Sequence, residues 1–235
     1  MEVYLLGGMI LILLVFSIMG YIRGSLKILL SLGSLFASLI LVFVVYPTAV
    51  SKFNNTVIHD VVEKKVSEYV DDNLKLDKQN GIEHTGIEGQ QKIIENMPLP
   101  KTITKKIKEN NTEEEYKELK VDNFEDYVKA YLVKEMMQII SFAIVFIVIH
   151  ALMILFVGLT RVLSKLPAVE SLDRTLGVII GLFEGYILIL IFCVVITALS
   201  GTGKMEPIFE AINNNKILST IYENNFLMML ILYFL

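Results

Sequence analysis

Four long segments of the chain are apolar and nearly free of charge, and they restrict the folds open to it more than any other feature. Residues 3–22, 28–51, 139–160 and 175–199 each reach the roughly 20 residues that a helix needs to cross the hydrocarbon core of a membrane. His150 and Glu184 are the only Asp, Glu, Lys, Arg or His residues within them. Lipid offers backbone groups no hydrogen-bond partner, so such segments cross as helices. The pattern predicts an all-α, polytopic membrane protein.

Charged residues are concentrated between the second and third segments. Residues 52–138 hold 32 of the 46 Asp, Glu, Lys and Arg residues. The net charge of the chain is −4, which excludes a basic nucleic-acid binder, so we expect no nucleic-acid partner. Cys193 is the single cysteine, which excludes a disulfide framework and a cysteine metal cluster.

Basic residues in the short connections indicate the orientation of the spans. Cytoplasmic loops carry an excess of Lys and Arg, and long loops cross largely regardless of charge. The first connection contains Arg23 and Lys27, and the connection before the fourth span contains Arg161, Lys165 and Arg174. Both connections are therefore predicted to be cytoplasmic. The N-terminus, residues 52–138 and the C-terminal tail are then predicted to lie outside.

This interpretation divides the chain into four parts. Two of them are hairpins, which together form a four-transmembrane-helix bundle. The first segment lacks a basic n-region and a small-residue cleavage site, so we interpret it as a retained span rather than a signal peptide. The predicted parts are a first transmembrane hairpin (1–51), an extracytoplasmic charged insert (52–138), a second transmembrane hairpin (139–200) and an amphipathic C-terminal tail (201–235).

The insert is predicted to be helical and partly disordered. Apolar residues recur on one helical face over residues 57–70, and a second helix is predicted to start at Phe124, with Asn123 as its N-cap, and to run directly into the third span. Residues 71–120 are rich in Lys, Glu and Asn, which favours a loosely ordered segment over a binding domain.

The tail is predicted to form a pair of short amphipathic helices. These would lie on the outer leaflet or pack against the bundle. The tail ends in ten apolar residues, 226–235, which are too few to span a membrane.

Small residues recur at helical spacing on the spans. Gly177, Gly181 and Gly185 repeat every four residues on the fourth span, and Gly20 and Gly24 do the same around the first connection. Such stripes let membrane helices approach closely, so we predict close helix packing there. A permeation path lined by glycine is the alternative.

Glu184 is the residue of the spans that most needs an explanation, because a carboxyl group inside a membrane rarely faces lipid. Glu184 and His150 lie at similar depths when residues are counted from the predicted ends of their spans. We therefore hypothesise that they face each other or a common polar pocket. Two alternatives stay open: a neutral Glu184 bonded to a hydroxyl such as Ser34 or Ser38, and a proton or ion relay.

The two predicted cytoplasmic turns contain the remaining candidate residues. Asp173 can cap the fourth helix, where a carboxylate also meets the helix dipole favourably. Arg174 and Arg23 are expected to anchor the spans on the cytoplasmic side. Binding of anionic lipid head groups or of a cytoplasmic partner is the alternative.

No enzymatic motif survives inspection. Gly203-Lys204 lacks the first glycine and the Ser or Thr of a phosphate-binding loop, and neither G-x-S-x-G nor H-E-x-x-H occurs. His59 and His84 sit singly in polar segments. We therefore expect no catalytic residue, no metal site and no cofactor, and a protein that is not an enzyme.

Two motifs resemble the colicin V production protein (CvpA) family. They are Gly20-Tyr-Ile-Arg-Gly-Ser-Leu-Lys27 and Leu172-Asp-Arg-Thr-Leu-Gly-Val-Ile-Ile-Gly-Leu-Phe-Glu-Gly185. The resemblance implies a bacterial inner-membrane protein with four spans, linked to the production or export of a peptide toxin or to envelope maintenance. This chain departs from the family in Glu184, where a basic residue is common, and in its long insert.

The resemblance leads to two expected functions. The first is a non-enzymatic scaffold or assembly factor in the bacterial cell (inner or plasma) membrane, with an envelope protein or a second copy bound through residues 52–138. The second is a small oligomeric channel or transporter that uses Glu184 and His150 near the bilayer midplane. The bilayer itself, and anionic lipid at the cytoplasmic turns, are the other expected partners.

Overall fold

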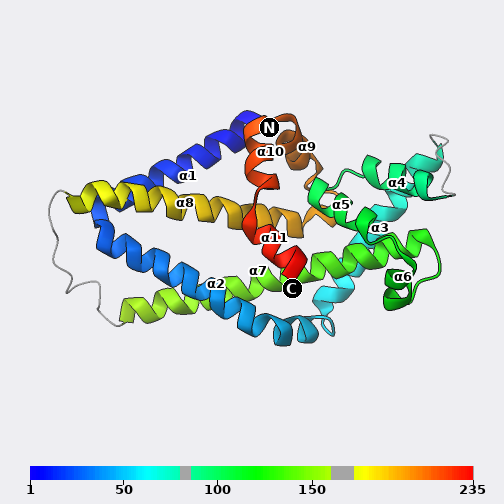
Figure 1. Ribbon diagram of the computed structural model, residues 1–235, viewed down its shortest axis with the longest axis horizontal. Helices are drawn as coiled ribbons and strands as arrows, with labels where there is room; N and C mark the ends of the chain where they lie inside the picture. Colours follow the sequence, from blue (N-terminus) through cyan, green and yellow to red (C-terminus); the bar gives the residue numbers. More distant parts are fainter. Residues whose placement is uncertain (80–85, 160–171, 235) are drawn as a thin grey trace. The chain divides into compact units, whose positions relative to one another are not determined.

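The computed structural model describes residues 1–79, 86–159 and 172–234, and these residues contain helices and no strand (Figure 1). The predicted all-α class is thus confirmed. In chain order the helices are α1 (Glu2–Arg23), α2 (Ser25–Phe53), α3 (Val57–Gln79), α4 (Ile87–Asn96), α5 (Lys101–Glu109), α6 (Glu113–Leu119), α7 (Phe124–Leu159), α8 (Leu172–Ala198), the 3-10 turn η2 (Ser200–Thr202), α9 (Glu206–Asn214), α10 (Lys216–Glu223) and α11 (Phe226–Phe234).

Four of these helices are long and apolar enough to cross a membrane, as predicted. They are α1, α2, α7 and α8. Each leaves large apolar side chains exposed, such as Val3, Val44, Leu155 and Ile179. Exposed apolar surface on this scale is rare in water but matches the lipid around a membrane protein.

The chain forms two compact units. The membrane unit comprises Met1–Ala49, Ser141–Val194 and Asn225–Leu235, and the charged unit comprises Val50–Ile140 and Val195–Asn224. Helices α2, α7 and α8 each contribute residues to both units.

The membrane unit has a core of apolar side chains from α2, α7 and α8. Ile28 and Val42 of α2 and Leu190 of α8 are fully buried. The rings of Phe43 on α2 and Phe142 on α7 meet edge to face, with their centroids 5.7 Å apart. These contacts hold the three helices together within the unit.

The charged unit is folded where composition favoured disorder. Residues 86–120 form α4, α5 and α6, and Ile93, Ile94, Ile103 and Ile107 are completely buried. The expectation of a loosely ordered segment is therefore wrong for these residues. These helices contain few apolar side chains, but the apolar side chains of each helix lie on one face and can be buried together. The overall composition of the segment does not show this arrangement.

Side-chain caps and a continuous helix join this unit to the third span. The backbone N–H of Asp126 donates a 2.9 Å hydrogen bond to Oδ1 of Asn123, which confirms the predicted N-cap. Helix α7 then runs without interruption from Phe124 to Leu159, also as predicted.

The predicted pair of short amphipathic tail helices is present as α9 and α10, each with its apolar face buried in the charged unit. The terminal apolar residues form α11, which belongs to the membrane unit. Asn225 fixes the start of α11, because its Nδ2 donates to the carbonyl of Leu190 on α8 at 2.8 Å. Its Oδ1 accepts from the backbone N–H of Leu227 and of Met228.

Candidate functional site

Helices α1 and α8 touch at their glycines, within the membrane unit. A Cβ atom added at Gly20 would lie 2.0 Å from the carbonyl oxygen of Gly177, and one added at Gly181 would lie 2.2 Å from that of Phe16. A Cβ at Gly185 would meet the Phe16 side chain at 3.1 Å. The backbones are in direct contact, so there is no open path at these glycines.

The first connection of the membrane unit turns sharply at Gly24. Its φ of 81° lies in the region that favours glycine, and α1 ends there. Arg23 and Lys27 on either side are exposed. The guanidinium of Arg174 lies 5.7 Å from the ring centroid of Tyr21, so α8 also contacts α1 through a cation–π interaction.

Part of the second predicted turn lies outside the residues that the structure describes. Arg161 and Lys165 lie outside the described residues, and so does His84. Asp173 lies in the first turn of α8, but its side chain is outside what the structure describes.

Glu184 is buried in the membrane unit and is bonded to a hydroxyl group of α2. Oγ of Ser31 donates a 2.6 Å hydrogen bond to Oε1 of Glu184, and the Glu184 residue is 5% exposed. Its second oxygen, Oε2, is buried and accepts no hydrogen bond from the residues that the structure describes. The sequence had offered a bond from Glu184 to a serine hydroxyl as one alternative. The structure has such a bond, with Ser31 as the partner and not Ser34 or Ser38.

His150 is bonded to a different serine of α2. Its Nδ1 lies 3.1 Å from Oγ of Ser38, and that hydroxyl donates its hydrogen to the carbonyl of Ser34 at 2.7 Å. An imidazole with its proton on Nδ1 completes this arrangement by donating to Oγ of Ser38. The ring also stacks on Phe146, with centroids 5.4 Å apart.

Glu184 and His150 therefore do not pair with each other, contrary to the hypothesis that they face one another. Their partners Ser31 and Ser38 are seven residues apart, which is about 10 Å along α2. Counting residues from the span ends did not identify the partners, because these depend on how α2 is rotated against α7 and α8.

The charged unit contains a buried ion pair that the sequence did not single out. Nζ of Lys106 on α5 donates to both carboxylate oxygens of Glu135 on α7, at 2.9 and 3.1 Å. The two residues are only 7% and 2% exposed. The signal available in the sequence was the position of Glu135 on the apolar face of α7, beside Met136 and one turn from Leu132.

The same unit has a polar cavity of about 570 Å³ with four acidic residues in its lining. We call it the acidic hollow. Its carboxylates come from α3 and α9: Glu68, Asp72, Glu206 and Glu210. Lys65 is the cation among its described lining residues.

Tyr69 also lines the acidic hollow. Its side-chain OH is buried and has no hydrogen-bond partner among the described residues. Burial, together with the nearby charge of Glu206, raises the pKa of Tyr69, so the phenol stays neutral.

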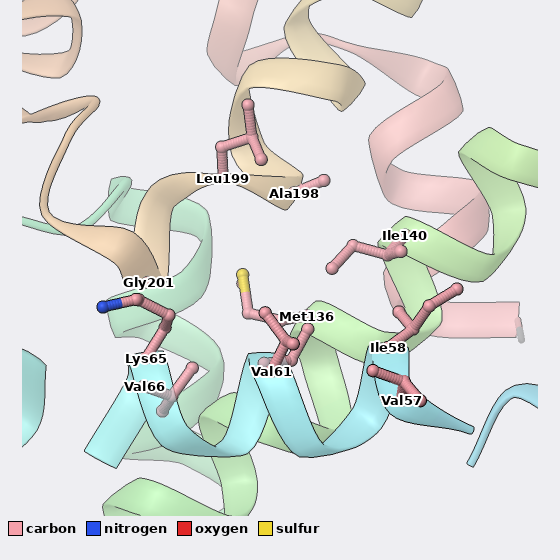
Figure 2. Close-up of a pocket in the computed structure, with 11 residues that line it drawn as sticks. Val57, Ile58, Val61, Lys65, Val66, Met136, Ile140, Ala198, Leu199 and Gly201 are labelled. Atoms are coloured by element: carbon pink, nitrogen blue, oxygen red, sulfur yellow. The ribbon is translucent and has the colours of Figure 1, made fainter. Parts of the chain in front are cut away.

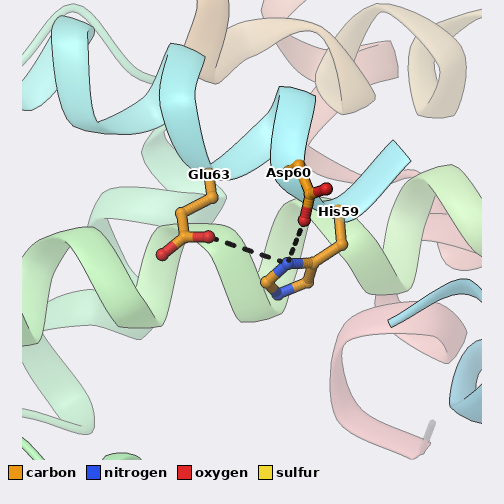
Figure 3. A group of neighbouring side chains, drawn as sticks. All are labelled: His59, Asp60 and Glu63. Atoms are coloured by element: carbon orange, nitrogen blue, oxygen red, sulfur yellow. Dashed lines mark ion pairs between the residues drawn. The ribbon is translucent and has the colours of Figure 1, made fainter. Parts of the chain in front are cut away.

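His59 is not isolated, as Figure 3 shows. Its Nδ1 lies 3.8 Å from Oε2 of Glu63 and 4.0 Å from Oδ1 of Asp60, and ligand atoms of all three residues lie within 4.8 Å of one another. The i, i+4 spacing of His59 and Glu63 was the signal that an inspection of histidines alone missed. Both carboxylates are exposed, so the arrangement is an open surface cluster.

Comparison with known proteins gives one match. Residues 120–224 match the family model described as colicin V production protein. The matched segment contains the motif at residues 172–185, and the motif at residues 20–27 lies outside it. Neither curated proteins nor solved structures give a match.

Proposed function

We propose that this chain, whose residues 120–224 belong to the colicin V production protein family, is a non-enzymatic assembly protein of a bacterial cell membrane. It would serve toxin production or export, or envelope maintenance. The observation that carries the proposal is the extent of the family segment. It includes the third and fourth spans and also α9 and α10, so it joins membrane helices to part of the charged unit.

The membrane unit is suited to the role of an anchor. Direct backbone contact between α1 and α8 at Gly20 and Gly177 leaves no space between these helices. The buried Glu184 and the half-buried His150 are each bonded to a serine of α2. These contacts favour a rigid, closed bundle over a path for solutes.

The charged unit is suited to the role of the binding part. Four carboxylates surround the acidic hollow, which favours a cationic segment of a protein partner. The buried, unpaired OH of Tyr69 adds a hydrogen-bonding group beside them. An envelope protein with a Lys- or Arg-rich segment, or a second copy of this chain, would fit this chemistry.

Charge reversal at the acidic hollow tests the binding role in the full-length chain. Deletion of residues 52–138 is unsuitable, because it removes most of the charged unit and the start of α7. Glu210→Lys should abolish the partner recovered after chemical crosslinking in intact cells. Asp122→Lys is the matched control, since Asp122 is also an exposed acidic residue but does not line the hollow. Equal loss or equal retention in both variants would contradict the proposal.

A small channel or transporter is the second candidate, and one observation favours it. Oε2 of Glu184 is buried in the membrane unit and has no hydrogen-bond partner among the described residues. Ionisable residues inside a membrane are costly, and many of them line ion pathways. The test is proton and ion flux in vesicles that contain the full-length protein or its Glu184→Gln variant. The channel proposal requires flux in the wild type that Glu184→Gln removes.

The proposed location is the bacterial plasma membrane, with both termini and residues 52–138 outside. A reporter that is active only outside the cytoplasm should be active when fused after Leu235. Activity of a cytoplasmic reporter at the same position would invert the proposed topology.

A further inference from the structure

The charged unit has a second cavity, of about 340 Å³, whose lining is almost wholly apolar (Figure 2). One wall is the face of α3 that carries Val57, Val61 and Lys65. Met136 and Ile140 of α7 form a second wall. We call this cavity the apolar pocket.

The third wall is the end of the fourth span. Ala198, Leu199 and Gly201 lie across from α3 and α7, and the sulfur of Met136 points toward this segment (Figure 2). The sulfur also accepts a 3.5 Å hydrogen bond from Oγ of Ser200, which holds the segment against α7. The pocket is thus formed where α3, α7 and the end of α8 meet.

The position of the pocket along the chain relates it to the membrane. Ala198 is the last residue of a helix that is long and apolar enough to span, and Ile140 lies on another such helix. Ala198 lies at the end of its span, and Ile140 lies at the start of residues 139–160, which the sequence predicts as the third span. Val57 and Val61 are 75% and 55% exposed, so the described residues leave the α3 wall uncovered.

We propose that the apolar pocket binds one acyl chain of an anionic phospholipid, with Lys65 contacting the phosphate. A cavity of about 150 Å³ holds a benzene molecule, so one of 340 Å³ has room for a considerable length of hydrocarbon chain. Lys65 is the charged residue in the lining. Its present partner is Glu68, in an exposed pair. Such pairs are weak, so the ammonium group can turn to a lipid phosphate.

This inference does not depend on the proposed assembly role, because the apolar pocket and the acidic hollow have different walls. Lys65 lines both, but the carboxylates of the hollow are absent from the pocket. A chain could bind lipid here whether or not it binds a partner at the hollow.

Photolabelling of the full-length protein in vesicles tests the proposal. The probe is phosphatidylglycerol with a diazirine in one acyl chain, present at a few per cent in phosphatidylcholine vesicles. Labelled peptides are mapped by mass spectrometry. Wild type should be labelled on α3 and at Met136, in addition to the general labelling of lipid-exposed α1.

Val61→Trp should fill the pocket and reduce the α3 and Met136 label at least fivefold, while labelling of α1 stays unchanged. Ile217→Trp is the matched control, since Ile217 is 60% exposed in the same unit and does not line the pocket. Unchanged labelling in Val61→Trp, or a label confined to α1 in the wild type, would overturn the proposal. So would a crosslink between two copies at α3 that Val61→Trp removes.

A separate experiment tests the contact between Lys65 and the lipid phosphate. A phosphatidylcholine probe with the same acyl diazirine should label the pocket several-fold less than phosphatidylglycerol. Lys65→Gln should remove this preference, and Lys64→Gln, which changes the exposed neighbouring lysine outside the lining, should keep it. Equal labelling by both lipids in the wild type would refute the contact with phosphate.

Discussion

Oγ of Ser31 donates a 2.6 Å hydrogen bond to Oε1 of Glu184, and this bond ties α2 to α8 inside the membrane unit. It explains how a carboxyl group is kept on an apolar helix. The first prediction concerns this bond. Ser31→Ala should destabilise the protein by about 1–3 kcal/mol, because the buried carboxyl group of Glu184 loses the hydrogen bond from Ser31.

Thermal unfolding in detergent measures this effect. Ser17→Ala is the control, since Oγ of Ser17 donates only to the carbonyl of Leu13 within α1. A loss of stability no larger in Ser31→Ala than in Ser17→Ala would show that the Glu184 bond contributes little.

The second prediction concerns the contact of α1 with α8. Gly177→Ala places a Cβ atom 2.3 Å from the carbonyl oxygen of Gly20, so the two helices must separate. Overpacking of this kind costs about 1–3 kcal/mol, and the unfolding midpoint should fall by several degrees. Gly8→Ala on α1, where a Cβ would meet nothing within 4 Å, should leave the midpoint unchanged or raise it. Equal midpoints for the two variants would be evidence against the close crossing.

The third prediction concerns the buried pair of Lys106 and Glu135. Lys106→Met alone should cost about 3–5 kcal/mol, because it leaves the buried carboxylate of Glu135 without its cation. The double variant Lys106→Met/Glu135→Leu should recover much of that loss. Chemical denaturation of the three proteins measures both effects, and strictly additive losses would contradict a coupled pair.

The fourth prediction concerns alkaline pH. Burial raises the pKa of Tyr69 in the folded state. The stability that the neutral phenol contributes is therefore fully present below the ordinary tyrosine pKa of about 10, and it is lost as the pH rises above that value. Tyr69→Phe removes an OH that has no hydrogen-bond partner among the described residues, so stability near pH 7 should be equal or higher. Above pH 10 the variant should lose less stability than the wild type. Parallel pH profiles for the two proteins would contradict this assignment.

The main architecture could be predicted from the sequence because it depends on local patterns. Uninterrupted apolar segments gave the spans, and Asn123 before an apolar-periodic run gave the start of α7. The fold of residues 86–120 could not be read in this way. Its core consists of a few isoleucines, such as Ile103 and Ile107, between lysines, and only tertiary packing shows that they are buried.

The partners of the candidate polar residues could not be predicted from local sequence patterns either. The need of Glu184 for a polar partner follows from its place in a span. Its partner depends on the rotation and tilt of α2 against α8, and these selected Ser31 instead of His150, Ser34 or Ser38. The acidic hollow likewise combines α3 with α9, which are more than 120 residues apart in sequence, so no local pattern could reveal it.

Photo-crosslinking in intact cells most directly tests the claim that the charged unit binds a protein partner. A photoreactive residue is introduced at Glu210, beside the acidic hollow, or at Ile10, which is exposed on α1. The account predicts a discrete protein adduct from position 210 that a basic competitor peptide reduces, and only lipid adducts from position 10. An absence of protein adducts at position 210, together with ion flux that depends on Glu184, would contradict the account.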